Sequence, residues 1–165
     1  MYKEKKVALI CMAALCAAMS IILGKVFAFT LLTLRISFES LPIILCSILL
    51  GPVAGMGAGL VADLVGCLLV GYTINPVITL GCTLMGLFPW LIKKYIHGKK
   101  GIFMSVIASH FICSVGIKTV GLLYYYGGGF PVVLTRLITY ICISALESYL
   151  VYLIYTAVGK RIVKK

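Results

Sequence analysis

Charged residues are scarce in this sequence. They make up 12% of its 165 residues, whereas hydrophobic residues make up 62%. This balance excludes the soluble globular class and indicates a membrane protein with several spans. Because one helical crossing takes roughly 20 apolar residues, the length leaves room for about six crossings and almost no domain outside the bilayer. We therefore predict an all-α membrane protein, a bundle of six transmembrane helices in which residues 1–165 form a single membrane domain.

Acidic residues are scarcer still, with four Asp and Glu against 15 Lys and Arg and a net charge of +11. In a soluble protein this excess would suggest nucleic acid, but here it is concentrated in three short clusters within residues 3–6, 93–100 and 160–165. Such clusters mark the cytoplasmic side of a membrane protein. If the chain crosses six times, all three clusters fall on that side. We expect cytoplasmic N- and C-termini, membrane lipid around the chain and no nucleic-acid partner.

Several chemical motifs are also missing. The seven cysteines lie singly in apolar runs, their number is odd and none forms a CxxC pair, so neither a disulfide framework nor a zinc site is supported. We expect no metal and no cofactor. No G-x4-GK[ST] loop occurs, so the chain cannot hydrolyse ATP by that route. Active transport would have to be powered by a partner or an ion gradient, and the absence of an evident inverted repeat of broken helices disfavours a self-sufficient transporter.

Proline and glycine divide the apolar sequence into helical runs. The first run continues to about Phe29, which is longer than a signal-peptide core, so we expect it to be a retained helix. Residues 30–38 alternate between apolar and polar types and are rich in β-formers, which predicts a short extended lid on the outer side. The expected helices cover about 7–29, 41–50, 52–70, 77–95, 101–123 and 132–158.

The stretch from 34 to 66 combines charge with a regular glycine spacing. Gly51, Gly55, Gly59 and Asp63 recur at every fourth position. Residues at this spacing share one face of a helix, and glycine lets another backbone come close. We expect this to be an interior face, with the Asp63 carboxylate standing on it.

Ionisable groups at membrane depth are costly unless they are paired or hydrated, which makes them functional candidates. Counted from the inner ends of their helices, Lys118 and Arg136 lie at similar levels near the outer side, and His110 and Glu147 lie at similar levels nearer the inside. We interpret the outer pair as a cationic pocket, because an anion between the two would remove their repulsion. We interpret the inner pair as a structural bond.

Other interpretations of these charges stay open. Lys118 could extend to the outer interface, and Arg136 could be a simple interfacial anchor. Asp63 could form a salt bridge to Arg35, Lys118 or Arg136 without any role in ligand binding.

Small residues recur in the first expected helix, where Ala13 and Ala17 form one row and Ala14 and Ala18 form another. Small residues at this spacing allow helices to approach closely in lipid. Packing within the bundle and docking of another subunit both explain them.

Aromatic residues gather in two loops that we place on the outer side. Tyr72 lies in the first loop, and Tyr124, Tyr125, Tyr126 and Phe130 lie in or beside the glycine-rich second loop. They fit an aromatic belt at the membrane interface. Their glycine-hinged setting also suits a lid that stacks on a flat heterocycle.

The sequence resembles the substrate-binding S components of energy-coupling factor (ECF) vitamin transporters, and within them the folate group. The resemblance covers essentially the whole chain. It is carried by the alanine rows, by RISFESLPIILCSILLGPVAGMGAGLVADLVG, by GYTINPVITLGCTLMGLFPW, by KTVGLLYYYGG and by the arginine early in the last helix.

The resemblance implies a vitamin-binding membrane subunit of a prokaryotic plasma membrane, and not an enzyme. It implies a pocket near the outer face, roofed by loops, and a first-helix alanine motif that docks on a transmembrane coupling subunit bound to two ATPases. Folate or a related pterin is the expected ligand. The candidate docking residues are then Ala13, Ala14, Ala17 and Ala18.

The candidate binding residues follow from the chemistry of folate, which has a flat pterin ring and a glutamate tail with two carboxylates. We assign Arg35, Lys118 and Arg136 to the carboxylates. The polar edges of the ring are assigned to Asp63 and Asn75. Stacking is assigned to Tyr72 and Tyr125.

Three alternatives remain at this point. The loop GYTINP is shorter than in many members of the folate group, so an S component for another vitamin is one alternative. A non-catalytic membrane assembly subunit that uses the alanine rows only for contacts is a second. A membrane enzyme with His110 and Glu147 as acid and base is the third, although no Ser, Cys or further metal ligand accompanies them in a recognisable motif.

Overall fold

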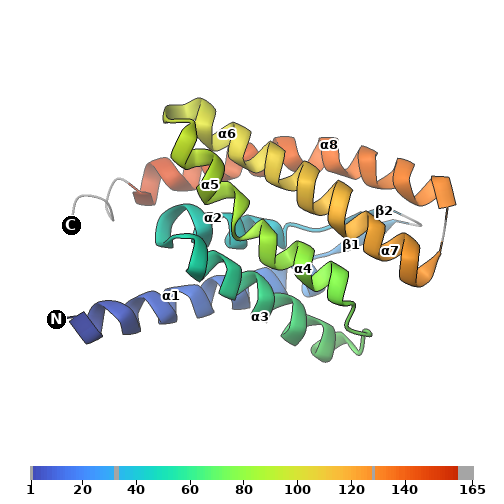
Figure 1. Ribbon diagram of the computed structural model, residues 1–165, viewed down its shortest axis with the longest axis horizontal. Helices are drawn as coiled ribbons and strands as arrows, with labels where there is room; N and C mark the ends of the chain where they lie inside the picture. The colour runs from blue at the N-terminus through green and yellow to red at the C-terminus, as the bar shows by residue number, and fades with distance from the viewer. Residues whose placement is uncertain (1, 32–33, 128, 160–165) are drawn as a thin grey trace.

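The computed structural model describes residues 2–31, 34–127 and 129–159 and is helical apart from one short two-stranded ribbon (Figure 1). Five helical segments of the described chain are long and apolar enough to cross a membrane: Lys6–Val26, Pro52–Val70, Pro76–Tyr95, Gly98–Tyr125 and Gly129–Ala157. The helix Ser40–Leu50 is apolar but has only 11 residues. At 1.5 Å per residue it is about 16 Å long, roughly half the hydrocarbon thickness.

The first helix, α1 (Tyr2–Ile21), continues into the π-helical turn η1 (Ile22–Val26) and stops there. The chain then forms an antiparallel hairpin of β1 (Phe29–Leu31) and β2 (Leu34–Ile36), in which Phe29 pairs with Ile36. The expectation of a helix to residue 29 was therefore too long, and extended structure replaces its end. The expected extended segment is present as this hairpin.

The short helix α2 (Ser40–Leu50) lies at the centre of the bundle, and its residues 40–48 are all buried. It packs on α1 and on α3 (Pro52–Val70), to which Gly51 joins it in a positive-φ conformation (φ 101°) that favours glycine. Pro52 at the first position and Gly71 after the last residue bound α3, as helix-end rules predict.

The glycine face of α3 lies directly against α4 (Pro76–Met85). A Cβ on Gly55 would be 2.5 Å from the Gly86 carbonyl oxygen, and one on Gly59 would be 2.3 Å from that of Cys82. The interior face expected from the four-residue spacing is therefore present at these two glycines, and Asp63 continues it.

The helix expected over 77–95 is divided into α4 and α5 (Phe88–Tyr95). Pro89 has no N–H for the Met85 carbonyl, and its ring excludes a regular helical turn before it. Gly86, in the break, lies so close to Gly55 that an added Cβ would be 2.2 Å from the Gly55 backbone.

The last two segments run antiparallel along one side of the bundle (Figure 1). One is α6 (Gly98–Ser109), continued by the nine-residue π-helix η2 (His110–Lys118) and α7 (Thr119–Tyr126). The other is α8 (Gly129–Ile154), which ends in η3 (Tyr155–Gly159). Both begin about three residues earlier than the expected 101–123 and 132–158.

The two ends of the bundle differ. The start of α1, the α5–α6 turn and the end of η3 lie at one end (Figure 1). The hairpin and the α3–α4 and α7–α8 connections lie at the other, which we call the hairpin end.

Candidate ligand-binding cavity

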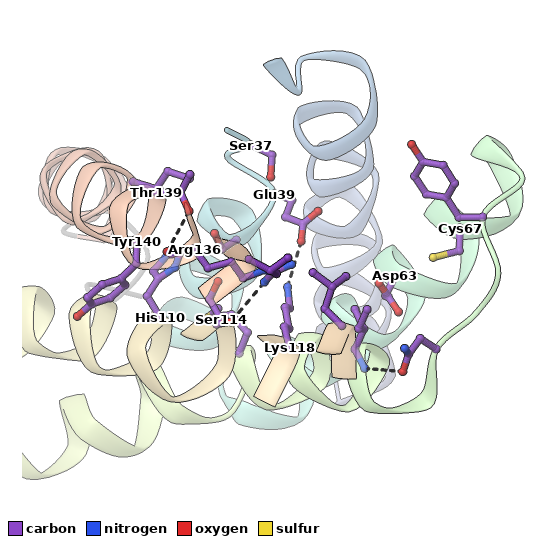
Figure 2. A pocket seen from close by; sticks show the side chains of 18 of the residues that line it. Ser37, Glu39, Asp63, Cys67, His110, Ser114, Lys118, Arg136, Thr139 and Tyr140 are labelled. Atoms are coloured by element: carbon purple, nitrogen blue, oxygen red, sulfur yellow. Dashed lines mark hydrogen bonds and ion pairs between the residues drawn. The ribbon is translucent and has the colours of Figure 1, made fainter. Parts of the chain in front are cut away.

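A cavity of about 790 Å³ extends into the bundle, and its lining comes from η1, the segment before α2, α3, α4, η2, α7 and α8. Tyr72 and Thr73, in the α3–α4 connection at the hairpin end, are among its lining residues. Figure 2 shows charged side chains meeting from opposite walls.

An ion pair crosses the middle of the cavity. The Lys118 Nζ, at the end of η2, lies 3.0 Å from the Glu39 Oε1, just before α2. The Lys118 side chain is 10% exposed and that of Glu39 is 28% exposed. The Lys118 stem runs past Gly81 of α4, where a Cβ would be 2.8 Å from Lys118 Cγ. The lysine is thus directed into the cavity rather than toward the interface.

The backbone at Glu39 is fixed from two sides. The buried hydroxyl of Ser20 in α1 donates a hydrogen bond of 2.6 Å to the Glu39 carbonyl. Gly24 in η1 makes room for the side chain, because a Cβ there would be 2.7 Å from Glu39 Cβ. The carboxylate therefore projects into the cavity from a held position.

Arg136 reaches the cavity from α8 opposite η2. Its Nη1 donates to the Ser114 carbonyl at 3.4 Å, and the Thr119 hydroxyl donates to the same oxygen at 3.1 Å. Ser114 lies inside the π-helix η2, and π-helical turns occur frequently at functional sites. The second cation of the expected pocket thus lines the same cavity as Lys118.

Asp63 stands at the α3 side of the cavity. Its Oδ2 accepts a 2.6 Å hydrogen bond from the Thr79 hydroxyl, and its Oδ1 accepts one of 3.4 Å from the Cys82 thiol. Among the described side chains no ion pair joins Asp63 to Lys118 or Arg136. Its possible salt bridge to Lys118 or Arg136 is therefore not formed in the structure.

Tyr72 and Lys25 form the end of the cavity beyond Asp63. The Lys25 Nζ is 5.5 Å from the centroid of the Tyr72 ring, within range of a cation–π interaction. The lysine stem passes Gly66, where a Cβ would be 2.8 Å from Lys25 Cε. Tyr72 is 54% exposed, so its ring is accessible.

Asn75 lines the cavity but already makes structural bonds. Its Oδ1 caps α4 by accepting from the Val77 and Ile78 amides at 3.0 and 3.4 Å. Its Nδ2 donates to the Gly121 carbonyl of α7 at 3.3 Å. We therefore regard it mainly as the residue that joins α4 to α7.

A second polar cluster lies at the base of the cavity. The His110 Nε2 is 2.6 Å from the Glu147 Oε2, and the Ser40 hydroxyl donates to both carboxylate oxygens at 2.8 and 2.9 Å. The Glu147 side chain is fully buried. The contact expected from helical depth is thus present, and it holds η2, α8 and the first residue of α2 together.

Two of the expected binding residues are not placed in this lining. Tyr125 is 53% exposed, packs edge-on against Tyr124 and does not line the cavity. Arg35 lies in β2, opposite Thr30, but its side chain is outside the described part of the structure. The hairpin nevertheless leads through Ser37, which lines the cavity, to Glu39.

Sequence reasoning missed two charged residues of the cavity, Lys25 and Glu39. Both lie near the ends of helices, where charges normally mark an interface rather than a site. The signal that could have found them is glycine on the facing helical segment: Gly66 opposite Lys25 and Gly24 opposite Glu39.

The alanine rows of α1 face different surroundings. Ala17 belongs to the apolar core, and Ala13 packs against it. Ala14 and Ala18 are exposed on the outside of the bundle. Only the second row is available for an external partner in this structure.

A family model and two solved structures point to the same class of membrane protein. Residues 9–164 match the family model of the ECF transporter substrate-specific component. No curated protein sequence matches the chain. Among solved structures, FolT bound with folic acid is similar at a TM-score of 0.74 and 23% identity, over 90% of each chain. The S component of a bacterial ECF transporter is similar at a TM-score of 0.72 and 22% identity, over 94% of this chain and 97% of the other.

Proposed function

Because the chain belongs to the family of ECF transporter substrate-specific components, we propose that it captures folate or a related reduced pterin for import. Family membership makes it a substrate-binding transporter component and not an enzyme, which removes the acid–base hypothesis for His110 and Glu147. The solved structure of FolT with folic acid supports folate, while its 23% identity leaves the ligand within the proposal.

The observation that carries the proposal is that the cavity offers both cations and a carboxylate, from different walls. Lys118 and Arg136 supply cations from η2 and α8, and Asp63 supplies a carboxylate from α3. Folate needs both kinds of partner. Its glutamate carboxylates suit the cations, and the amino and ring N–H groups of the pterin are donors that suit Asp63.

In this arrangement the heterocycle lies toward Asp63 and Tyr72, and the glutamate tail lies toward Lys118 and Arg136. The exposed ring of Tyr72 is available for stacking on the pterin. Arg35 remains a candidate for a carboxylate, since the hairpin that carries it leads into the cavity wall. Tyr125 does not line the cavity and has no place in this arrangement.

We further propose a prokaryotic plasma-membrane location, six crossings and cytoplasmic termini. The protein would deliver its ligand by docking on a transmembrane coupling subunit bound to two ATPases. The exposed Ala14 and Ala18 on α1 are the proposed docking row, because small exposed residues allow a partner helix to approach closely.

The test is isothermal titration calorimetry of the purified protein in detergent with folate, thiamine, riboflavin and biotin. Trp90 is not among the lining residues, so calorimetry is more direct than its fluorescence. Saturable binding of folate alone supports the proposal. Binding of another vitamin alone would move the substrate within the family, and no binding of any would favour the assembly role.

Substitution of the two cations tests the site itself. In Arg136→Gln and Lys118→Gln, loss of one charge-assisted hydrogen bond should weaken folate binding by about 1.5–3 kcal/mol, or roughly 10- to 150-fold. Lys100→Gln is the matched control, because Lys100 is exposed at the start of α6, outside the cavity lining. Parent-like binding in both cavity variants would show that the ligand does not use these cations.

A further inference from the structure

A carboxylate of the chain itself contacts one of the two cations that suit a ligand carboxylate. Glu39 Oε1 accepts from the Lys118 ammonium at 3.0 Å, in the middle of the cavity (Figure 2). Lys118 is one of the two cations that suit a folate tail, so a bound carboxylate and Glu39 would compete for the same donor. The ion pair is therefore part of the recognition site and not only of the fold.

The two partners differ in how easily they can be separated. Lys118 is 10% exposed and its stem is confined by Gly81, so the ammonium stays in place. The Glu39 side chain is 28% exposed, so part of it already contacts solvent. The more accessible partner is thus the acid, which is the group that an incoming anion would displace.

The backbone around Glu39 is held independently of this ion pair. Ser20 binds the Glu39 carbonyl at 2.6 Å, and the neighbouring Ser40 hydroxyl binds both oxygens of Glu147. Loss of the Glu39 to Lys118 contact therefore leaves the start of α2 anchored to α1 and α8. Only a side chain needs to move.

From these contacts we infer that Glu39 is an internal counter-ion that a substrate carboxylate displaces from Lys118. This inference rests on the proposed function, because it needs a carboxylate ligand in this cavity. Glu39 stabilises Lys118 within the protein, since a nearly buried ammonium without an anion is costly. It also makes binding selective, because a ligand without a carboxylate cannot replace it on the lysine.

The competition has a distinctive consequence for mutation. Removing a residue that binds ligand weakens binding, whereas removing an internal competitor strengthens it. Glu39→Gln keeps the size and the hydrogen-bond acceptor but loses the charge. Folate should bind this variant about threefold to tenfold more tightly, the order expected for one partly buried ion pair. The neutral probe 6-hydroxymethylpterin, which has the ring without a carboxylate, should change less than twofold or stay undetectable for both proteins.

The Lys118→Gln background supplies the control for net charge. There Glu39→Gln removes the same charge from the same cavity, but the contested donor of the 3.0 Å ion pair is absent. A long-range effect of net charge would make Glu39→Gln tighten folate binding in both backgrounds. Displacement predicts tightening only where Lys118 is present.

The experiment is calorimetric titration of folate and 6-hydroxymethylpterin into the parent and these variants in detergent. If Glu39→Gln does not fold, Glu39→Asp retains the charge but withdraws it by one methylene, and it should also tighten folate binding. Weaker or unchanged folate binding in the folded Glu39 variant, or equal tightening by Glu39→Gln in the Lys118→Gln background, would overturn the exchange alone. A parent that does not bind folate would instead remove the proposed function together with the exchange.

Discussion

Three charged residues of the cavity each lie against a glycine on a neighbouring element. A Cβ at Gly24, Gly66 or Gly81 would come within 2.7 to 2.8 Å of the stem of Glu39, Lys25 or Lys118. Real Cβ contacts are not this short, so any other residue would push the stem aside. The glycines therefore determine where these charges point.

Gly81→Ala tests this arrangement at one residue. The added methyl would displace Lys118 Cγ. It would also lie 3.4 Å from the Ile117 side chain and from the Cys113 carbonyl oxygen, which limits where the lysine stem can move. We expect folate affinity to fall about fivefold or more, since misplacing one charge-assisted bond costs about 1 kcal/mol. Calorimetry of the purified variant gives the dissociation constant.

Gly57→Ala is the control for this substitution. Gly57 also lies in a helix, but nothing stands within 4 Å of a Cβ there. Its folate affinity should remain that of the parent, while the gain in helix propensity should keep stability equal or higher. Unchanged affinity in Gly81→Ala would mean that Lys118 can reach the ligand from another position.

At this scale the sequence predicts which groups matter better than it predicts their partners. The contact of His110 with Glu147 follows from helical depth alone, because both lie on long continuous helices. Lys118 was matched by depth to Arg136, yet its observed partner is Glu39. Glu39 follows an irregular segment, so no helical count relates its level to that of Lys118.

Elements differ in how far their boundaries follow from local rules. The ends of α3 are set by Gly51 and Pro52 at its start and by Gly71 after its last residue. The expected helix 52–70 matches the observed span. The break between α4 and α5 depends on Pro89 together with the packing of Gly86 on Gly55. Such a contact between distant residues cannot be read from periodicity. The same holds for η2, since nothing in its sequence, HFICSVGIK, predicts π-helical rather than α-helical turns.

The helix α1 presents one alanine row to the core and one to its surroundings. Ala17 is 3% exposed, whereas Ala14 and Ala18 are exposed. A substitution can therefore separate folding from docking on the same helix. The structure thus places one row in the core and leaves the other as the candidate for docking.

We expect Ala14→Leu with Ala18→Leu to retain folate binding in detergent but to lose uptake of folate by cells that contain the coupling subunit and ATPases. The larger side chains would keep a partner helix at a distance, since close approach requires small residues. Radiolabelled folate uptake and calorimetry on the same variant give the two readouts. Normal uptake would show that this row does not dock.

Ala17→Leu is the comparison on the inward row. Replacing a methyl by an isobutyl side chain in a filled core causes overpacking, which typically costs about 1–3 kcal/mol. This variant should lose thermal stability and folate binding together. Equal behaviour of the two variants would contradict the division of α1 into two faces.

The whole molecule has chemically different ends. The described lysines of the α5–α6 turn lie at the end opposite the hairpin, and two of them contact tyrosines near the end of the chain. The Lys93 Nζ is 3.9 Å from the ring centroid of Tyr155, and the Lys99 Nζ is 5.7 Å from that of Tyr152. Clustered lysines favour the cytoplasmic side, whereas tyrosines are enriched at both membrane interfaces. The cavity entrance would then face outside, where a vitamin is captured.

This polarity predicts which loops are accessible in intact cells. A short epitope inserted after Gly127, between α7 and α8, should bind antibody without permeabilisation. The same epitope inserted after His97, before α6, should bind only after permeabilisation, because the lysines beside it favour the cytoplasmic side. The first insertion follows Gly127 and the second precedes Gly98, and both glycines have positive φ. Neither position lies inside a helix, so insertion should preserve folding. Retained folate binding by each purified variant checks this. Labelling of the His97 insertion alone in intact cells would invert the topology and place the cavity entrance inside, which capture of an external vitamin cannot accommodate.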